Sequence, residues 1–256
     1  MPNLNIINDG RQICKVLDNP RFKNIIFSVS EDADPIDKAH QTFDEYKLSD
    51  KGTFQVIPDK NRDRETIFIC GSAGSGKSYW TASYVREYIK IFPNNEVYLI
   101  TECKEDKVLD DITKIKRMKV DDSLVDNPID FNEFENCLCI FDDTDALTGK
   151  LGKNVFSLRD KLLKNARKKR VSVISTNHTC TGPELKAVLN ESDTIVFFMR
   201  NYNRALQYLL ENYIGLSKEG VKNLKKNKSR WTAYIKSYPN VIIQEHNITT
   251  LDKIQE

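Results

Sequence analysis

A glycine-rich loop carries the most specific chemical pattern of the chain. Residues 71–78 read Gly-Ser-Ala-Gly-Ser-Gly-Lys-Ser, follow an apolar run at 66–70 and precede a predicted helix at 77–91. Glycines let successive backbone N–H groups point at one centre, which forms a nest for an anion. We therefore expect the loop to bind a nucleoside triphosphate, with the Lys77 ammonium on the β- and γ-phosphates and the Ser78 hydroxyl on Mg²⁺. The predicted nucleotide-binding residues are Gly71, Ser72, Ala73, Gly74, Ser75, Gly76, Lys77, Ser78 and Tyr79.

Paired carboxylates follow a second apolar run, at residues 137–141. Adjacent acids at the end of a buried strand carry a desolvation cost that a bound cation offsets. We expect Asp142 to hold Mg²⁺ together with Ser78, and Asp143 to orient or deprotonate the attacking water. An acid beside the metal-binding acid is typical of hydrolysing motors rather than of most small-molecule kinases. GTPases are disfavoured, because no Asp-x-x-Gly follows this run and no Asn-Lys-x-Asp occurs in the chain. The predicted reaction is the hydrolysis of ATP to ADP and phosphate.

Polar side chains also end a third apolar run, at residues 171–176. The Asn177 amide is suited to contact the γ-phosphate and the water. We interpret His178 as a structural residue, with a contact to the nucleotide as the alternative. A basic stretch at 159–170 lies upstream, on a predicted helix at 154–169. Its basic end either satisfies the helix dipole or presents an arginine, for which we choose Arg167, to the γ-phosphate of a neighbouring subunit.

The order of the predicted elements positions these residues. Near-continuous apolar strands at 66–70, 96–101, 137–141, 171–176 and 195–198 alternate with helices. This pattern predicts an α/β P-loop NTPase fold with a mainly parallel sheet and helices on both faces. Ligands bind at the carboxyl ends of such strands, where the loop, the paired acids and Asn177 all fall.

We divide the chain into three segments. Residues 1–63 form an N-terminal extension, 64–200 the P-loop ATPase core, and 201–256 a C-terminal extension with a basic helix at 218–226 and a hairpin at 231–236 and 241–244. Residues 215–236 hold seven basic side chains and one acid, although the net charge of the whole chain is only +2. We expect this stretch to contact the phosphates of DNA without reading its sequence.

Composition sets further limits. Charged residues make up 30% of the chain and the hydrophobic set 39%, which suits a soluble globular protein. The six cysteines form no Cys-x-x-Cys and are interpreted as reduced thiols of an intracellular protein. The three scattered histidines disfavour a zinc site. No apolar run reaches about 20 residues, so no membrane span is expected.

The order of the motifs resembles that of the FtsK–HerA superfamily of DNA-pumping ATPases. The similarity covers residues 66–198 and is greatest to the genome-packaging ATPases of poxviruses, other large cytoplasmic DNA viruses and virophages. In place of that family's Gly-Arg-His-like motif this chain has Ala166-Arg167-Lys168, and in place of its strand-end glutamine it has Asn177. Residues 183–189 correspond to a proline-led turn.

The resemblance implies partners as well as an activity. It implies a homo-oligomeric ring, pentameric or hexameric, that threads double-stranded DNA into a preformed capsid and contacts capsid proteins. The corresponding location is the host cytoplasm, in a viral factory, and the virion. Three alternatives stay open: another ring ATPase such as a replication helicase or AAA+ initiator, a nucleoside or metabolite kinase, and a non-catalytic ATP-binding scaffold.

Overall fold

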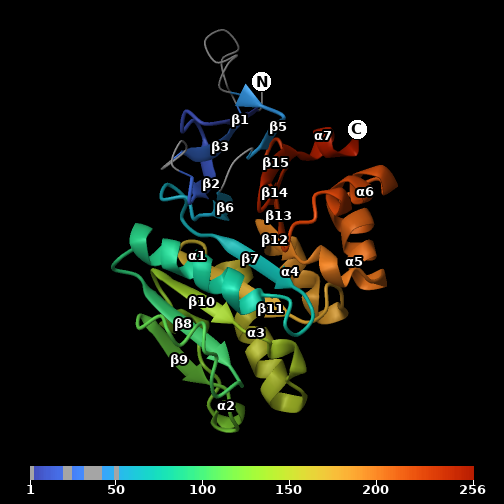
Figure 1. Cartoon of the computed structure of the whole chain (residues 1–256). Coiled ribbons are helices and arrows are strands. Elements are labelled where there is room, and N and C mark those ends of the chain that lie inside the picture. Colours follow the sequence, from blue (N-terminus) through green and yellow to red (C-terminus); the bar gives the residue numbers. More distant parts are fainter. Residues whose placement is uncertain (1–2, 20–24, 32–41, 49–51) are drawn as a thin grey trace. The chain divides into compact units, whose positions relative to one another are not determined.

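The chain divides into two compact units. A computed structural model describes residues 3–19, 25–31, 42–48 and 52–256 (Figure 1). The core unit is Arg62–Ile195, and the flanking unit combines Met1–Asn61 with Val196–Glu256. The predicted segments 1–63 and 201–256 therefore both contribute to the flanking unit, and part of the first lies outside the described residues.

Five parallel strands form the sheet of the core unit. Their order is β7-β11-β10-β8-β9, and every neighbouring pair runs parallel. Residues of β7, β10 and β11 are buried throughout, as expected for strands covered on both faces. The predicted α/β fold with a mainly parallel sheet is confirmed. The strands are β7 (Thr66–Cys70), β8 (Glu96–Thr101), β9 (Ile115–Lys119), β10 (Cys137–Phe141) and β11 (Val171–Asn177).

Helices connect these strands, and α1 lies across the sheet in the view of Figure 1. The longest are α1 (Lys77–Ile91), with the predicted bounds, and α3 (Gly149–Asn165). Shorter pieces are α2 (Ser123–Asp126), α4 (Lys186–Glu191), η1 (Phe131–Glu133), η2 (Thr144–Ala146) and η3 (Pro183–Leu185).

The bounds predicted for α3, 154–169, are wrong at both ends. The helix begins after the extended residue Thr148 and closes at Ala166, whose carbonyl accepts the Val171 N–H (3.3 Å) as the chain turns into β11. Arg170 adopts a left-handed φ of 54° in this turn. Arg167 therefore lies in the turn between α3 and β11 rather than on the helix.

The flanking unit is built from antiparallel strands and short helices. One sheet has the order β4-β1-β3-β2-β6, and a second set pairs as β5-β15-β14-β13. The predicted C-terminal hairpin is confirmed by β13 and β14, and β15 adds a strand that the sequence did not indicate. The strands are β1 (Asn3–Asn5), β2 (Arg11–Leu17), β3 (Ile26–Ser30), β4 (Thr42–Phe43), β5 (Glu45–Lys47), β6 (Thr53–Val56), β13 (Thr232–Ile235), β14 (Val241–Gln244) and β15 (Asn247–Thr250).

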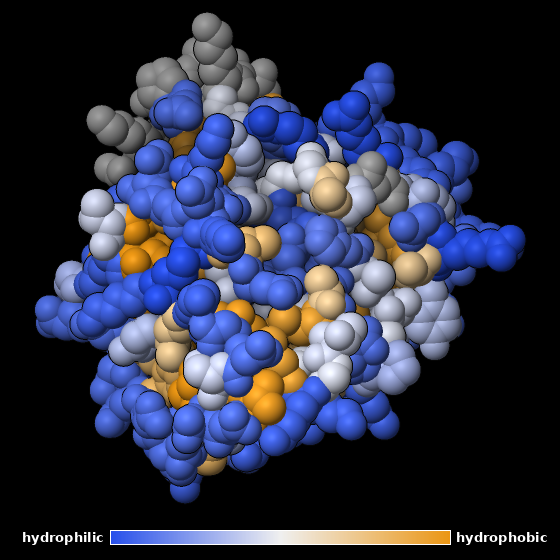
Figure 2. Space-filling model, turned by 90° about the horizontal axis from the view of Figure 1, so that it is seen from below, coloured by the Kyte–Doolittle hydropathy of each residue, from blue (hydrophilic) through white to orange (hydrophobic). Residues whose placement is uncertain are grey.

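Strand β12 (Thr194–Phe197) contains the point where the chain passes from one unit to the other. The helices beyond it are η4 (Met199–Asn201), α5 (Arg204–Tyr208), the π-helix η5 (Leu209–Ile214), α6 (Lys218–Lys226) and α7 (Leu251–Gln255). The face shown in Figure 2 is mostly hydrophilic, with hydrophobic residues gathered in a few patches. Across the described residues, none of the helices has the length and apolarity needed to cross a membrane.

Candidate active site

The glycine-rich loop joins β7 to α1 and is held at both ends. Gly71 N–H donates to the backbone oxygen of Asn177 (3.0 Å), which ties the start of the loop to the end of β11. Gly74 and Gly76 have φ of 71° and 110°, a left-handed conformation that glycine adopts without strain. Gly76 is also the N-cap of α1. The loop therefore has the backbone conformation and the following helix that a phosphate nest needs.

The side chains of the loop differ in accessibility. Ser72, Ala73 and Gly74 are exposed, whereas Ser75 and Ser78 are half-buried. The buried hydroxyl of Ser75 has no hydrogen-bond partner among the described residues. Tyr79, which follows Ser78, is 70% exposed.

The Lys77 side chain, although charged, is buried at the junction of three strand ends. Its Nζ donates to the Gly71 carbonyl (2.9 Å). It also lies 3.3 Å from Asp143 Oδ1 and 3.3 Å from His178 Nδ1. These partners follow β7, β10 and β11, so the sheet order brings the loop, one predicted acid and a histidine together.

Thr176, which the sequence analysis left without a role, organises the two acids. Its hydroxyl donates to Asp142 Oδ1 (2.8 Å) and accepts the backbone N–H of Asp143 (3.0 Å). Phe141 pairs with Ser175 in the parallel register of β10 and β11, which puts the next residues of the two strands side by side. In the sequence, the only indication of this role of Thr176 was a hydroxyl side chain at the end of an apolar run. Its partner could be identified only from the register.

The environments of the two acids differ. Asp142 is buried, and burial raises its pKa to about 6, against the lowering effect of the Thr176 hydrogen bond. The negative charge of Asp143 raises the Asp142 pKa further, and Lys77 lowers it. Asp143 is half-buried and has a left-handed φ of 47°. A charged Asp142 is therefore unfavourable until a cation lies beside it, which fits a carboxylate that would hold Mg²⁺.

The side chains of Asn177 and His178, at the end of β11, lie in different environments. The Asn177 side chain is fully buried, and its Oδ1 accepts from Ser175 Oγ (3.0 Å). Its Nδ2 has no partner in the part of the chain that the structure describes. The His178 ring, interpreted above as structural, instead lies between Lys77 and Asp143, with Nε2 3.3 Å from Asp143 Oδ2.

Further groups around His178 complete the cluster. The backbone N–H of His178 donates to Asp145 Oδ2 (2.7 Å). Asp143, Asp145 and His178 offer oxygen and nitrogen atoms that all lie within 4.8 Å of one another, as metal ligands do. This set differs from the predicted Mg²⁺ ligands, Ser78 and Asp142.

Arg167 is not brought to this cluster. It precedes β11, whereas the loop and the acids adjoin the carboxyl end of that strand. Seven strand residues at about 3.3 Å each separate the two ends by roughly 20 Å. The Arg167 side chain is 75% exposed and lies 3.7 Å from the Asp63 carboxylate.

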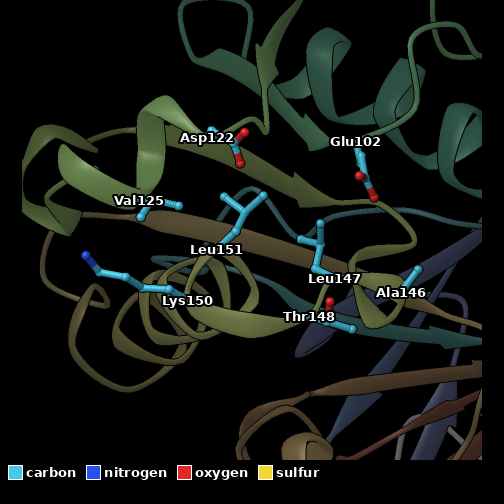
Figure 3. Close-up of a pocket in the computed structure, with 8 residues that line it drawn as sticks. All are labelled: Glu102, Asp122, Val125, Ala146, Leu147, Thr148, Lys150 and Leu151. Carbon is cyan, nitrogen blue, oxygen red and sulfur yellow. The ribbon is translucent and has the colours of Figure 1, made fainter.

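A separate pocket of about 340 Å³ lies beyond the acids (Figure 3). It is formed by α2, the end of η2 and the start of α3, and it contains no residue of the glycine-rich loop. Figure 3 shows Leu147 and Leu151 between the acidic side chains of Asp122 and Glu102. The lining residues are Glu102, Asp122, Val125, Ala146, Leu147, Thr148, Lys150 and Leu151.

Comparisons with known proteins place the chain in a family. No family model matches it. The uncharacterized protein V3 of Sputnik virophage is 32% identical over 252 residues, which cover 97% of this chain and 98% of V3. The cytoplasmic domain of the type VII secretion ATPase EccC from Thermomonospora curvata is similar in structure, with a TM-score of 0.51 and 11% identity over 82% of this chain and 30% of EccC.

A third similarity is to B204, the DNA-packaging ATPase from Sulfolobus turreted icosahedral virus. Its TM-score is 0.48 and its identity 16%, over 72% of this chain and 98% of B204. The extent of the similarity to V3 shows that the chain belongs to the family of this virophage protein, and the similarity to EccC shows that its fold is that of an ATPase domain.

Proposed function

We propose that this protein is an ATP-hydrolysing translocase of double-stranded DNA that packages a viral genome into a preformed capsid. The observation that carries the proposal is the contact of the Lys77 ammonium with the Asp143 carboxylate. It lies next to the buried Asp142, at the carboxyl ends of the parallel strands. A buried lysine ammonium and two carboxylates at this edge of an ATPase fold are suited to the transfer of a phosphoryl group to water. The resemblance of the motif order to that of genome-packaging ATPases supports the choice of DNA as the substrate of the motor, and the virophage relative supports a viral setting.

The proposed roles follow from the chemistry of each side chain. The backbone N–H groups of residues 71–78 and the Lys77 ammonium bind the phosphates of ATP. Ser78 and Asp142 hold Mg²⁺, which when bound neutralises charge on the phosphate oxygens. Asp143 accepts a proton from the attacking water. The exposed Tyr79 ring stacks on the base.

Asn177 is proposed to contact the γ-phosphate. Its unpartnered Nδ2 supports this role, because a buried amide donor without a partner is unfavourable and a phosphate oxygen would satisfy it. The buried position means that the loop, which is hydrogen-bonded to the Asn177 backbone, must shift for the contact to form.

The proposed partners are double-stranded DNA, further copies of the chain in a pentameric or hexameric ring, and capsid proteins. The ring works in the host cytoplasm, in the viral factory, and accompanies the virion. The basic stretch around α6 is the proposed DNA contact, although Lys222 and Lys226 already lie 3.2 and 3.7 Å from Glu219. Lys225 lies over the ring of Tyr202.

The central test is ATP hydrolysis with and without long double-stranded DNA. We expect DNA to stimulate the rate. Lys77→Ala should abolish hydrolysis and weaken ATP binding, because the phosphates then face only backbone donors. Asp143→Asn should still bind ATP but turn over about 10²-fold more slowly, the usual scale for loss of a general base.

Asp126→Asn, at an exposed position of α2, is the matched control and should behave as the wild type. ATP hydrolysis that does not respond to DNA would contradict the translocase. Separation of DNA strands would identify a helicase instead. Near-normal turnover in Asp143→Asn would move the general base to another acid.

The role of Asp142 predicts a pH-dependent stability. Because burial raises the pKa of folded Asp142 to about 6, its charge destabilises the fold above that pH, and the penalty disappears as the pH falls toward the unfolded value near 4. In the absence of Mg²⁺, Asp142→Asn should therefore stabilise the protein at pH 7.5 by on the order of 1–3 kcal/mol and leave it unchanged at pH 4. Urea unfolding at both pH values measures this, and an equal effect at both would contradict the assignment.

Arg167 is proposed to act on the γ-phosphate of the neighbouring subunit, since it lies too far from its own loop. A guanidinium there is worth as much as ~10³-fold in rate. Arg167→Ala and Lys77→Ala subunits should each be inactive alone and regain ATPase when mixed, because one class of interface then holds both groups. Mixed rings that stay inactive would exclude the trans role. If Lys77→Ala subunits regain ATPase when mixed with Arg170→Ala but not when mixed with Arg167→Ala, the trans role belongs to Arg170.

The basic stretch is tested by the salt dependence of DNA binding. Each phosphate contact contributes about −0.9 to the slope of log K against log salt. Replacing Lys222, Lys225 and Lys226 with glutamine should flatten the slope by about 2–3 without changing sequence preference. The control neutralises Lys153, Lys161 and Lys164, which are exposed on α3. An unchanged slope in the first variant would place the DNA contact elsewhere.

A further inference from the structure

His178 bridges the two groups that the proposed reaction depends on. Its Nδ1 lies 3.3 Å from Lys77 Nζ and its Nε2 lies 3.3 Å from Asp143 Oδ2. The ring side chain is 40% exposed, so burial alone does not explain its position. The backbone N–H of His178 donates a hydrogen bond to Asp145 Oδ2, which fixes the backbone from which the ring extends.

The chemistry of the neighbours matches one tautomer of the neutral ring. A lysine ammonium can only donate, so Nδ1 must accept. A carboxylate can only accept, so Nε2 must carry the hydrogen. The neutral Nε2–H tautomer satisfies both contacts. An imidazolium would instead direct a second N–H at the Lys77 ammonium.

The two oxygens of Asp143 therefore have different partners. Oδ2 lies 3.3 Å from His178 Nε2, whereas Oδ1 lies 3.3 Å from Lys77 Nζ and 3.3 Å from the Thr176 hydroxyl. An anionic phosphate at the loop attracts the Lys77 ammonium, which weakens its contact with Oδ1. The contact of Oδ2 with His178 Nε2 and that of Oδ1 with the Thr176 hydroxyl do not involve Lys77, so they hold the carboxylate while Oδ1 becomes able to accept from water.

We propose that His178 is a positioning residue that holds Asp143 through Nε2–H while its Nδ1 accepts from the Lys77 ammonium. This inference rests on the proposed ATP hydrolysis. His178 touches neither substrate nor metal in this scheme and acts through its two neighbours. The loop follows β7 and the acids follow β10, and His178 adds a third group to the cluster from the carboxyl end of β11.

Three substitutions separate the two contacts. A glutamine amide nitrogen reaches about as far as Nε2, whereas an asparagine amide reaches about as far as Nδ1. His178→Gln therefore keeps a donor for Asp143, His178→Asn keeps only the group facing Lys77, and His178→Ala removes both. Thr179→Ala, at the exposed neighbouring position, is the matched control.

We expect His178→Ala to lower kcat by about 10–100-fold, as for other residues that orient a catalytic group, while KM for ATP changes less than about threefold. His178→Gln should recover most of the kcat and His178→Asn should not. Equal recovery by both, an unchanged kcat in the alanine variant, or a large rise in KM alone would overturn the proposal.

A second measurement does not require hydrolysis. Imidazole ¹⁵N NMR at pH 8, with the His178 signals assigned from their absence in His178→Gln, reports the tautomer. We expect the Nε2–H form, with the Nδ1 resonance shifted in Lys77→Ala or when a non-hydrolysable ATP analogue is added. The Nδ1–H form, or an Nδ1 resonance indifferent to Lys77, would overturn the bridge. If wild type and Thr179→Ala both lack ATPase while the NMR results hold, the proposed function fails and the bridge stands.

Discussion

The burial of the Lys77 ammonium is the constraint from which the site follows. An unpaired cation in the protein interior is strongly unfavourable, and removing one member of a buried charged pair typically costs about 3–5 kcal/mol. Here the compensating groups are the Gly71 carbonyl, the Asp143 carboxylate and the His178 ring. They come from the ends of three neighbouring strands. The order β7-β11-β10 is therefore as important to the site as any single side chain, since a different order would separate the cation from its partners.

The same edge of the sheet concentrates unfavourable features. Asp142 is buried with a raised pKa, and Asp143 has a left-handed backbone that costs a non-glycine residue roughly 1–2 kcal/mol. The Asn177 Nδ2 and the Ser75 hydroxyl are buried without partners among the residues described. Such features persist only where the surrounding structure enforces them, and here they are enforced by fully buried parallel strands. Their gathering around one loop is what separates this edge from the rest of the core unit.

The sequence predicted the parts of the site that depend on local patterns. The loop, β7 and α1 follow from residue order along one stretch, and so does the placing of Asp142 and Asp143 at the end of a strand. Thr176 and His178 could not be assigned in this way, because their partners lie more than 30 residues away and meet them only through the β10–β11 register. The ends of α3 were missed for a related reason. The turn before β11 is set by a backbone bond from Val171 to Ala166, which residue propensities do not reveal.

The flanking unit contains strand pairings that local sequence patterns could not predict. β5 pairs with β15, and the facing residues Tyr46 and Ile248 are about 200 positions apart in the sequence. The N-terminal and C-terminal segments, which the sequence analysis treated as two separate extensions, thus form one unit. The core unit, by contrast, is a single stretch from Arg62 to Ile195. The contacts of the core unit join residues of this one stretch, whereas the β5–β15 pairing of the flanking unit requires both ends of the chain, so loop-closure entropy favours formation of the core unit first. The glycine-rich loop and both acids belong to that contiguous stretch, so the candidate site is assembled without strands from either terminus.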